Sequence, residues 1–106
     1  MAGMTMNEAQ ARISQRREIT ERLKERIINR LMLQLEPDEI AEDSPLFGSG
    51  LGLDSVDALE IVVTVESEFG VSITDEDMQA FRSINTVVDF IEAKLLQKLI
   101  QKGEQI

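Results

Sequence analysis

The sequence predicts a small all-α protein: a four-helix bundle of three main helices and one short third helix, with a long loop between the first and second helices. Apolar residues recur every three or four positions in three long stretches, as they do on the buried side of amphipathic helices. Proline and glycine lie between these stretches, where helices end. The 106 residues suit one domain with a modest core.

Residues 1–12 are predicted to form a flexible tail, and residues 13–106 the bundle domain. The start of the chain is polar and rich in methionine, so it has little apolar surface to bury. It also lacks a basic segment followed by an apolar one, so we expect no secretory signal and a cytoplasmic protein. No stretch approaches the roughly 18 apolar residues of a transmembrane helix.

The first helix is expected from about Ser14 to Leu33. Charged residues separate its apolar positions and are expected to face solvent, Lys24 among them. The apolar positions recur every four residues and predict one buried stripe: Ile19, Leu23, Ile27 and Leu31.

Proline then ends the helical pattern, and residues 36–45 are expected to form a loop with one short turn at 37–40. Ile40 and the pair Leu46 and Phe47 are the apolar anchors of this connection. The glycine-rich run 48–52 superficially resembles a phosphate-binding loop, but no strand precedes it and no Lys-Ser/Thr follows it. It predicts a mobile approach to the next helix and no nucleotide site.

The second helix is expected to begin after Asp54, a good N-cap with Asp57 as its capping-box partner. Gly70 supplies the stop after Phe69. Ser55 then falls in the first turn, beside backbone N–H groups that lack helical partners. A phosphate esterified to its hydroxyl would meet the positive end of the helix dipole.

This second helix carries two apolar stripes on nearly opposite sides. One core cannot bury both stripes of a single helix, so the second one is expected to be offered to a partner. The stripe predicted to be buried consists of Ala58, Ile61, Val62, Val65 and Phe69. The stripe predicted to be exposed consists of Val56, Leu59 and Val63, rimmed by Glu60 and Glu66.

A short third helix is expected at residues 75–80, capped by Thr74 with Asp77 three positions on. Asp75 and Asp77 alternate as calcium ligands do, but the rest of a calcium loop is absent, so we expect no metal site. Met78 and Phe81 are expected to close one end of the core.

The last helix is expected to start near Thr86, with Asp89 in the box position, and to run to about Lys98 or beyond. Two further apolar residues, Leu96 and Ile100, predict a longer helix or a weak self-association surface. Its buried stripe is predicted to contain Val87, Val88, Ile91, Leu95 and Leu99.

Composition and charge exclude several function classes. The chain has no Cys and no His, so disulfides, Cys/His metal sites, cysteine nucleophiles and Ser-His relays are excluded. From residue 31 to 81 there are thirteen acidic residues and no Lys or Arg. Such a segment repels nucleic acid and attracts basic protein surfaces. A solvated acidic face is the plainer alternative for an acidic run.

The run Leu51-Gly52-Leu53-Asp54-Ser55-Val56, with the acidic helix after it and Glu68-Phe69-Gly70-Val71 at its end, resembles the acyl carrier proteins. The resemblance extends from about Arg17 to Lys98. It implies that Ser55, next to Asp54, carries 4′-phosphopantetheine, whose thiol holds acyl chains as thioesters.

The resemblance also implies partners for the predicted surface. A phosphopantetheinyl transferase would modify Ser55 from coenzyme A, and acyl-transferring and chain-modifying enzymes with basic docking surfaces would follow. Arg and Lys on these enzymes would engage the acidic rim, Asp57, Glu60 and Glu66, around the apolar centre Val56, Leu59 and Val63. The acyl chain would be sheltered around Leu59, Val62, Ile73 and Ile91.

We therefore expect a monomeric carrier and not an enzyme, since no acid/base, nucleophile or metal constellation converges in the sequence. Fatty-acid, polyketide and specialised lipid pathways stay open as sources of the cargo. The alternative is a helical adaptor that binds basic or amphipathic helices without a prosthetic group. In that case Ser55 is an ordinary unmodified helix-start serine.

Overall fold

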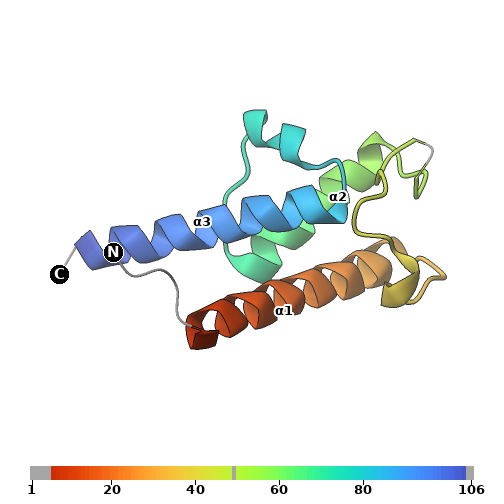
Figure 1. Cartoon of the computed structure of the whole chain (residues 1–106). Coiled ribbons are helices and arrows are strands. Elements are labelled where there is room, and N and C mark those ends of the chain that lie inside the picture. Colours follow the sequence, from red (N-terminus) through yellow and green to blue (C-terminus); the bar gives the residue numbers. More distant parts are fainter. Residues whose placement is uncertain (1–5, 49, 105–106) are drawn as a thin grey trace.

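The computed structural model describes residues 6–48 and 50–104 and contains three α-helices and two short 3₁₀ helices (Figure 1). Within these residues there is no β-strand, only an isolated bridge between Phe47 and Leu53, so the predicted all-α class is confirmed. None of the described helices combines the length and apolar character that a membrane crossing requires. The elements in chain order are α1 (Met6–Leu31), η1 (Pro37–Glu39), α2 (Ser55–Phe69), η2 (Glu76–Ala80) and α3 (Ile84–Glu104).

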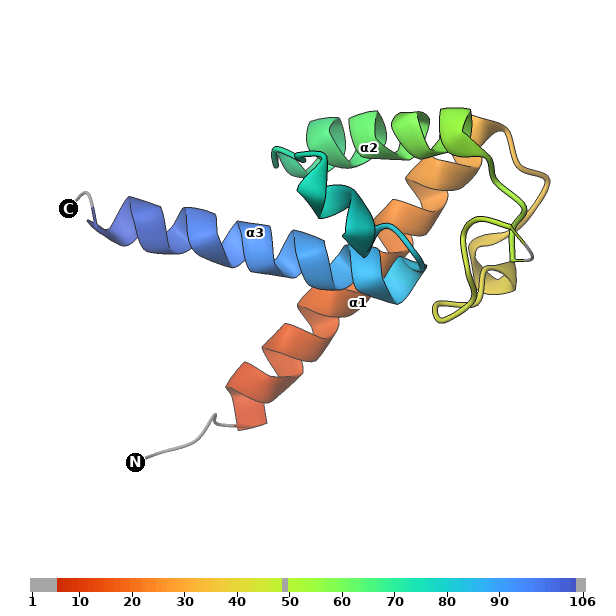
Figure 2. The same ribbon diagram turned by 90° about the horizontal axis from the view of Figure 1, so that it is seen from above.

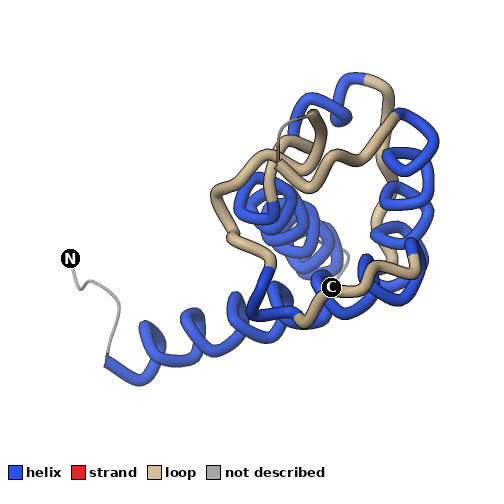
Figure 3. The backbone as a smooth tube through the Cα atoms, turned by 90° about the vertical axis from the view of Figure 1, so that its right-hand side faces the viewer, coloured by secondary structure: helices blue, strands red, loops and turns tan. Residues whose placement is uncertain are grey.

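The helix α1 is the platform on which the other two long helices pack. Figure 2 shows α2 lying over the C-terminal part of α1, while α3 crosses α1 and then diverges from it. The first turns of α1 and the last turns of α3 therefore extend away from the bundle. The tube view in Figure 3 looks at the molecule from the side on which the long connection between α1 and α2 lies.

The core between these helices is almost entirely aliphatic. The predicted anchors Ile40 and Leu46 bring the α1–α2 connection into it, and Phe81 closes one end as predicted, while Met78 is only half-buried. The largest side chains that are fully buried are Leu23, Ile27, Leu46, Ile61, Ile84, Ile91, Val65, Val87 and Val88.

The structure corrects both ends of the first helix. It begins at Met6 and not near Ser14, so residues 6–12 of the predicted tail continue α1, while residues 1–5 lie outside the described residues. Residues 7–12 are mostly strong helix formers, which is the signal that the tail prediction overlooked. The helix ends at Leu31 and not at Leu33.

Met32 ends α1 because its backbone is left-handed, with φ 55°. The amide of Leu33 donates to the carbonyl of Ile28 at 2.9 Å, the six-to-one bond of a Schellman motif. Glycine usually occupies such a position because a side chain there strains the backbone. Met32 is also 85% exposed, so no packing offsets this strain.

Lys24 is buried, contrary to the prediction that it faces solvent. Its ammonium Nζ lies 2.8 Å from Oε2 of Glu42, which is half-exposed. The carbonyl of Glu42 accepts a hydrogen bond from the amide of Asn85 at the start of α3. A long aliphatic stem can be buried while its charge reaches the edge of the core. Through these two contacts, Glu42 joins the α1–α2 connection to both α1 and α3.

The last helix begins at Ile84, two positions before the predicted Thr86. Ser83 Oγ accepts from the amide of Thr86 at 3.3 Å, and Thr86 Oγ1 accepts from the amide of Ser83 at 3.0 Å. These reciprocal bonds act as a capping box. The predicted box residue Asp89 instead pairs with Arg16 of α1 at 2.8 Å. Leu99 was predicted in the buried stripe but is 66% exposed.

The short third helix is a 3₁₀ helix that begins at Glu76, so Asp75 and not the predicted Thr74 occupies its N-cap position. The predicted pairing of Thr74 with Asp77 is present one residue earlier. Thr74 Oγ1 accepts from the amide of Asp77 at 3.3 Å, and Asp77 Oδ2 accepts from the amide of Thr74 at 2.9 Å. This bond to the Thr74 backbone holds the pKa of Asp77 below its ordinary value.

Glu68 joins the far end of α2 to α1. Its carboxylate lies 2.6 Å from Arg22 and 2.7 Å from Arg26, and its side chain is only 17% exposed. The guanidinium of Arg22 also covers the ring of Phe69, 5.0 Å from its centroid. The hydrogen bond from Arg22 lowers the pKa of Glu68 below its ordinary value.

Replacing Met32 by glycine is expected to stabilise the protein by about 1 kcal/mol, because the left-handed strain disappears. The free energy of unfolding in urea measures the change. Met32→Ala is the matched control: it removes the same exposed side chain but keeps the Cβ. Equal stabilities of the two variants would contradict a strain located in this backbone.

Glu68→Gln is expected to cost about 1 kcal/mol of stability at neutral pH, since it breaks a carboxylate contact with two arginines. A lowered folded-state pKa adds stability above the ordinary pKa of Glu, about 4.3, and this stability is lost as the pH falls through the lowered value. The difference from the wild type should therefore vanish in acid.

Urea unfolding as a function of pH tests the role of Glu68. Glu25→Gln, at an exposed acid on α1, makes the same change of charge and is the control. A difference between the wild type and Glu68→Gln that persists in acid would mean that packing, and not charge, is the contribution of Glu68.

Candidate functional site

Ser55 is the first residue of α2, and its side chain is exposed at the end of the molecule where the long connection arrives (Figure 1). The approach to it is held by backbone contacts. The amide of Leu53 donates to the carbonyl of Leu46 at 3.2 Å, next to the bridge between Phe47 and Leu53. The Ser55 hydroxyl therefore lies outside the core, where a modifying enzyme could reach it.

The predicted capping box around Ser55 is present. Asp54 Oδ1 accepts hydrogen bonds from the amides of Val56 and Asp57, each at 3.0 Å, and Asp57 Oδ2 accepts from the amide of Asp54 at 3.0 Å. The Asp54 carboxylate thus occupies two of the amides that a phosphate on Ser55 was expected to meet. The box holds the start of the helix, and a phosphate at Ser55 would lie beside two carboxylates.

Gly50 lies in a tight turn on the approach to Ser55. A side chain on Gly50 would place its Cβ 1.6 Å from the carbonyl oxygen of Pro45, so only glycine fits there. The amide of Leu51 donates to the same carbonyl at 3.1 Å. Gly50 is therefore explained by the turn that brings the chain to α2.

The two stripes of α2 divide between core and surface as predicted. Ile61, Val65 and Phe69 are buried, and Ala58 and Val62 are half-buried. On the other side, Val56 is 66% exposed, Leu59 64% and Val63 47%. We call these last three residues the exposed stripe. Three exposed apolar residues on one face of a helix, beside Ser55, are typical of contact surfaces.

Each of the three predicted rim acids makes a contact within the chain. Asp57 belongs to the capping box, and Glu66 Oε2 accepts from the amide of Ile73 at 2.9 Å. Glu60 Oε2 lies 2.9 Å from Nε of Arg30, in the last turn of α1. Arg30 was not among the predicted site residues, because no local pattern in the sequence connects residues 30 and 60.

The four residues predicted to shelter an acyl chain lie at different depths in the structure. Ile91 is fully buried, and Val62 and Ile73 are half-buried against the core, whereas Leu59 belongs to the exposed stripe. The three inner residues form part of the aliphatic core beneath α2. No group of metal-ligating side chains occurs among the described residues.

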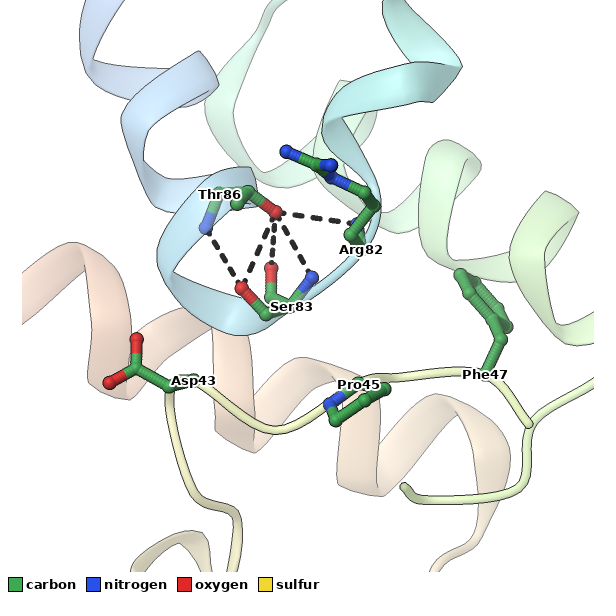
Figure 4. A pocket seen from close by; sticks show the side chains of 6 residues that line it. All are labelled: Asp43, Pro45, Phe47, Arg82, Ser83 and Thr86. Atoms are coloured by element: carbon green, nitrogen blue, oxygen red, sulfur yellow. Dashed lines mark hydrogen bonds between the residues drawn. The ribbon is translucent and has the colours of Figure 1, made fainter. Parts of the chain in front are cut away.

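An open surface pocket of about 470 Å³ lies between the long connection and the start of α3 (Figure 4). In the close-up, the ring of Phe47 stands at one side, Ser83 and Thr86 form the opposite wall, and the guanidinium of Arg82 points away from Pro45. The sequence contains no pattern that predicts this pocket. Its lining residues are Asp43, Pro45, Phe47, Arg82, Ser83 and Thr86.

Comparison with known proteins agrees with this geometry. Residues 21–91 match the family model of the phosphopantetheine attachment site, which includes Ser55. The acyl carrier protein of Solidesulfovibrio magneticus is 37% identical over 76 residues, 72% of this chain and 94% of that protein. The acyl carrier protein of Buchnera aphidicola subsp. Acyrthosiphon pisum is 34% identical over 80 residues, 76% of this chain and 96% of that protein.

The fold has a matching solved structure as well. The acyl carrier protein from Enterococcus faecalis superposes with a TM-score of 0.61 at 28% identity, covering 74% of this chain and 96% of that one. The predicted prosthetic group, 4′-phosphopantetheine, is confirmed by the matched attachment domain. The chain belongs to the acyl carrier protein family.

Proposed function

We propose that this protein carries acyl intermediates of fatty-acid or related lipid biosynthesis on 4′-phosphopantetheine attached to Ser55. The observation that carries the proposal is the exposed Ser55 hydroxyl at the start of α2, held by the Asp54–Asp57 box next to the exposed stripe. The position combines a free nucleophilic oxygen, a rigid helix start and an apolar contact surface.

Ser55 Oγ forms the new bond to phosphorus when a separate phosphopantetheinyl transferase acts on coenzyme A. The pyrophosphate bond of coenzyme A breaks, the adenosine bisphosphate leaves, and the transferase accepts the hydroxyl proton. When attached, the group supplies the thiol that holds the acyl chain as a thioester. This chain contains no cysteine that could do so.

Asp54 and Asp57 act as positioning residues in this proposal. Their reciprocal hydrogen bonds fix the first turn of α2, so Ser55 is presented in one orientation. Because Asp54 already binds the amides of Val56 and Asp57, those amides do not hold a phosphate on Ser55. Ser55 is exposed, so an arm attached there would be accessible to partner enzymes.

The exposed stripe forms the desolvated centre of the docking surface, and Asp57, Glu60 and Glu66 form its acidic rim. Apolar residues at the centre of an interface supply most of its binding energy, and rim charges guide the encounter with basic partners. Exposed ion pairs contribute little each. This combination suits a carrier that has to dissociate from one enzyme after each step.

Between steps, we propose that the acyl chain is sheltered by the inner residues Val62, Ile73 and Ile91, through a separation of the helices that surround them. The core there is aliphatic, so an alkyl chain would replace contacts of the same kind. We further propose that the carrier acts as a monomer in the cytoplasm, where its transferase would draw on coenzyme A.

Incubation with coenzyme A and a promiscuous phosphopantetheinyl transferase is expected to add one phosphopantetheinyl group, measured by intact mass. Ser55→Ala should abolish the addition. Ser67→Ala, at another exposed serine of α2, should leave it unchanged. An adduct that survives Ser55→Ala, or no adduct on the wild type, would contradict the proposal and favour an adaptor without a prosthetic group.

Leu59→Ser is expected to raise the KM of the transferase for this protein by about tenfold, since it removes a central apolar contact. Its melting temperature should hardly change, because the side chain is 64% exposed. Leu99→Ser is the matched control, at a leucine that is 66% exposed on the far part of α3. Equal KM values for the two variants would show that the exposed stripe is not a docking surface.

A further inference from the structure

We propose that Arg30 controls which partners dock on α2, because its guanidinium holds Glu60 and a partner's cation has to displace it. This inference rests on the proposed docking surface. It assigns a specificity-determining role to a residue outside α2. The partner it concerns is a protein surface that presents Lys or Arg to the acidic rim.

The Arg30–Glu60 pair lies at the edge of the exposed stripe. Glu60 follows Val56 by four positions and precedes Val63 by three, so all three share one side of α2. Arg30 reaches this side from the last turn of α1, which passes next to α2 in Figure 2. Its Nε lies 2.9 Å from Glu60 Oε2, and the two side chains are 50% and 47% exposed.

Glu60 differs from the other two rim acids because the group that it contacts is positively charged. Asp57 and Glu66 accept hydrogen bonds from backbone amides, which are neutral, so each keeps its full negative charge and a second oxygen for a partner. In the part of the chain that the structure describes, only Glu60 among the three has a guanidinium in contact. The rim is therefore one charge less negative than the acidic segment suggests.

The exposure of the pair makes it replaceable. The other arginine contact of α2, at Glu68, uses two guanidinium groups and leaves Glu68 only 17% exposed. Glu60 has one guanidinium and remains half open to solvent. Exposed single ion pairs are weak, so an incoming cation can take the place of Arg30. A partner without a well-placed cation leaves the pair closed and gains nothing from Glu60.

The test compares Arg30→Gln with Arg26→Gln in the transferase reaction, with coenzyme A as the co-substrate. Both variants remove one positive charge from α1, but Arg26 pairs with Glu68 and not with Glu60. Arg30→Gln is expected to lower the KM for the carrier about two- to fivefold with kcat unchanged. Arg26→Gln should lower it less, and the difference between the two should shrink at high salt.

A second pair of variants tests the competition directly. Glu60→Gln should raise KM more in the Arg30→Gln background than in the wild type. In the wild type, Glu60 loses its contact with Arg30 when it gains one with the partner's cation. In the Arg30→Gln background, Glu60 gains the partner's cation without losing a contact. Equal effects in both backgrounds would overturn the inference.

The outcomes separate this inference from the function on which it rests. If Ser55 is modified and Arg30→Gln gives the same KM as Arg26→Gln, Arg30 does not compete for Glu60. If Arg30→Gln raises KM, Arg30 contacts an acid of the partner and the inference is wrong. If no variant is modified at Ser55, the proposed function fails and this inference fails with it.

Discussion

The helix α2 has apolar residues on two sides, and a bundle of this size can bury only one of them. Ile61, Val65 and Phe69 pack into the core, which leaves Val56, Leu59 and Val63 outside. The orientation of α2 on α1 thereby decides which surface other proteins can meet. Ser55 lies at the N-terminal end of that surface, where the capping box has already fixed the direction of the helix.

The same packing determines how the acidic segment is balanced. Arg22, Arg26 and Arg30 follow one another at intervals of four residues and so share one side of α1. Arg22 and Arg26 meet Glu68, and Arg30 meets Glu60, so α1 and α2 run antiparallel. The segment from 31 to 81 has no cation of its own. Part of its negative charge is therefore neutralised by arginines of α1.

The long connection between α1 and α2 is held at several points, and these contacts position Ser55. Lys24 holds Glu42 from within α1, and the amide of Leu46 donates to the carbonyl of Arg82 at 2.8 Å. Leu53 then donates to Leu46 two residues before Ser55. A loop of this length would cost much conformational entropy if it were free, and each anchor reduces the part that can move.

The sequence alone determined the features that depend on residues three or four positions apart. The Asp54–Asp57 box, the Thr74–Asp77 box, the stop at Gly70 and the two stripes of α2 are of this kind, because a helix turn brings such residues together. The start of α3 was also local: Ser83 and Thr86 have capping-box spacing, and the prediction gave Asp89 that role instead. The helical residues 6–12 likewise carried a readable propensity.

Only the tertiary structure decided the features that join distant parts of the chain. The burial of Lys24 requires Glu42, the contact of Arg30 requires Glu60, and the open pocket beside Phe47 requires the start of α3. The spacing of residues within one helix does not predict which residues of another helix they contact. A charged side chain can therefore be assigned to a helix face from the sequence, but its partner is fixed by how the helices pack.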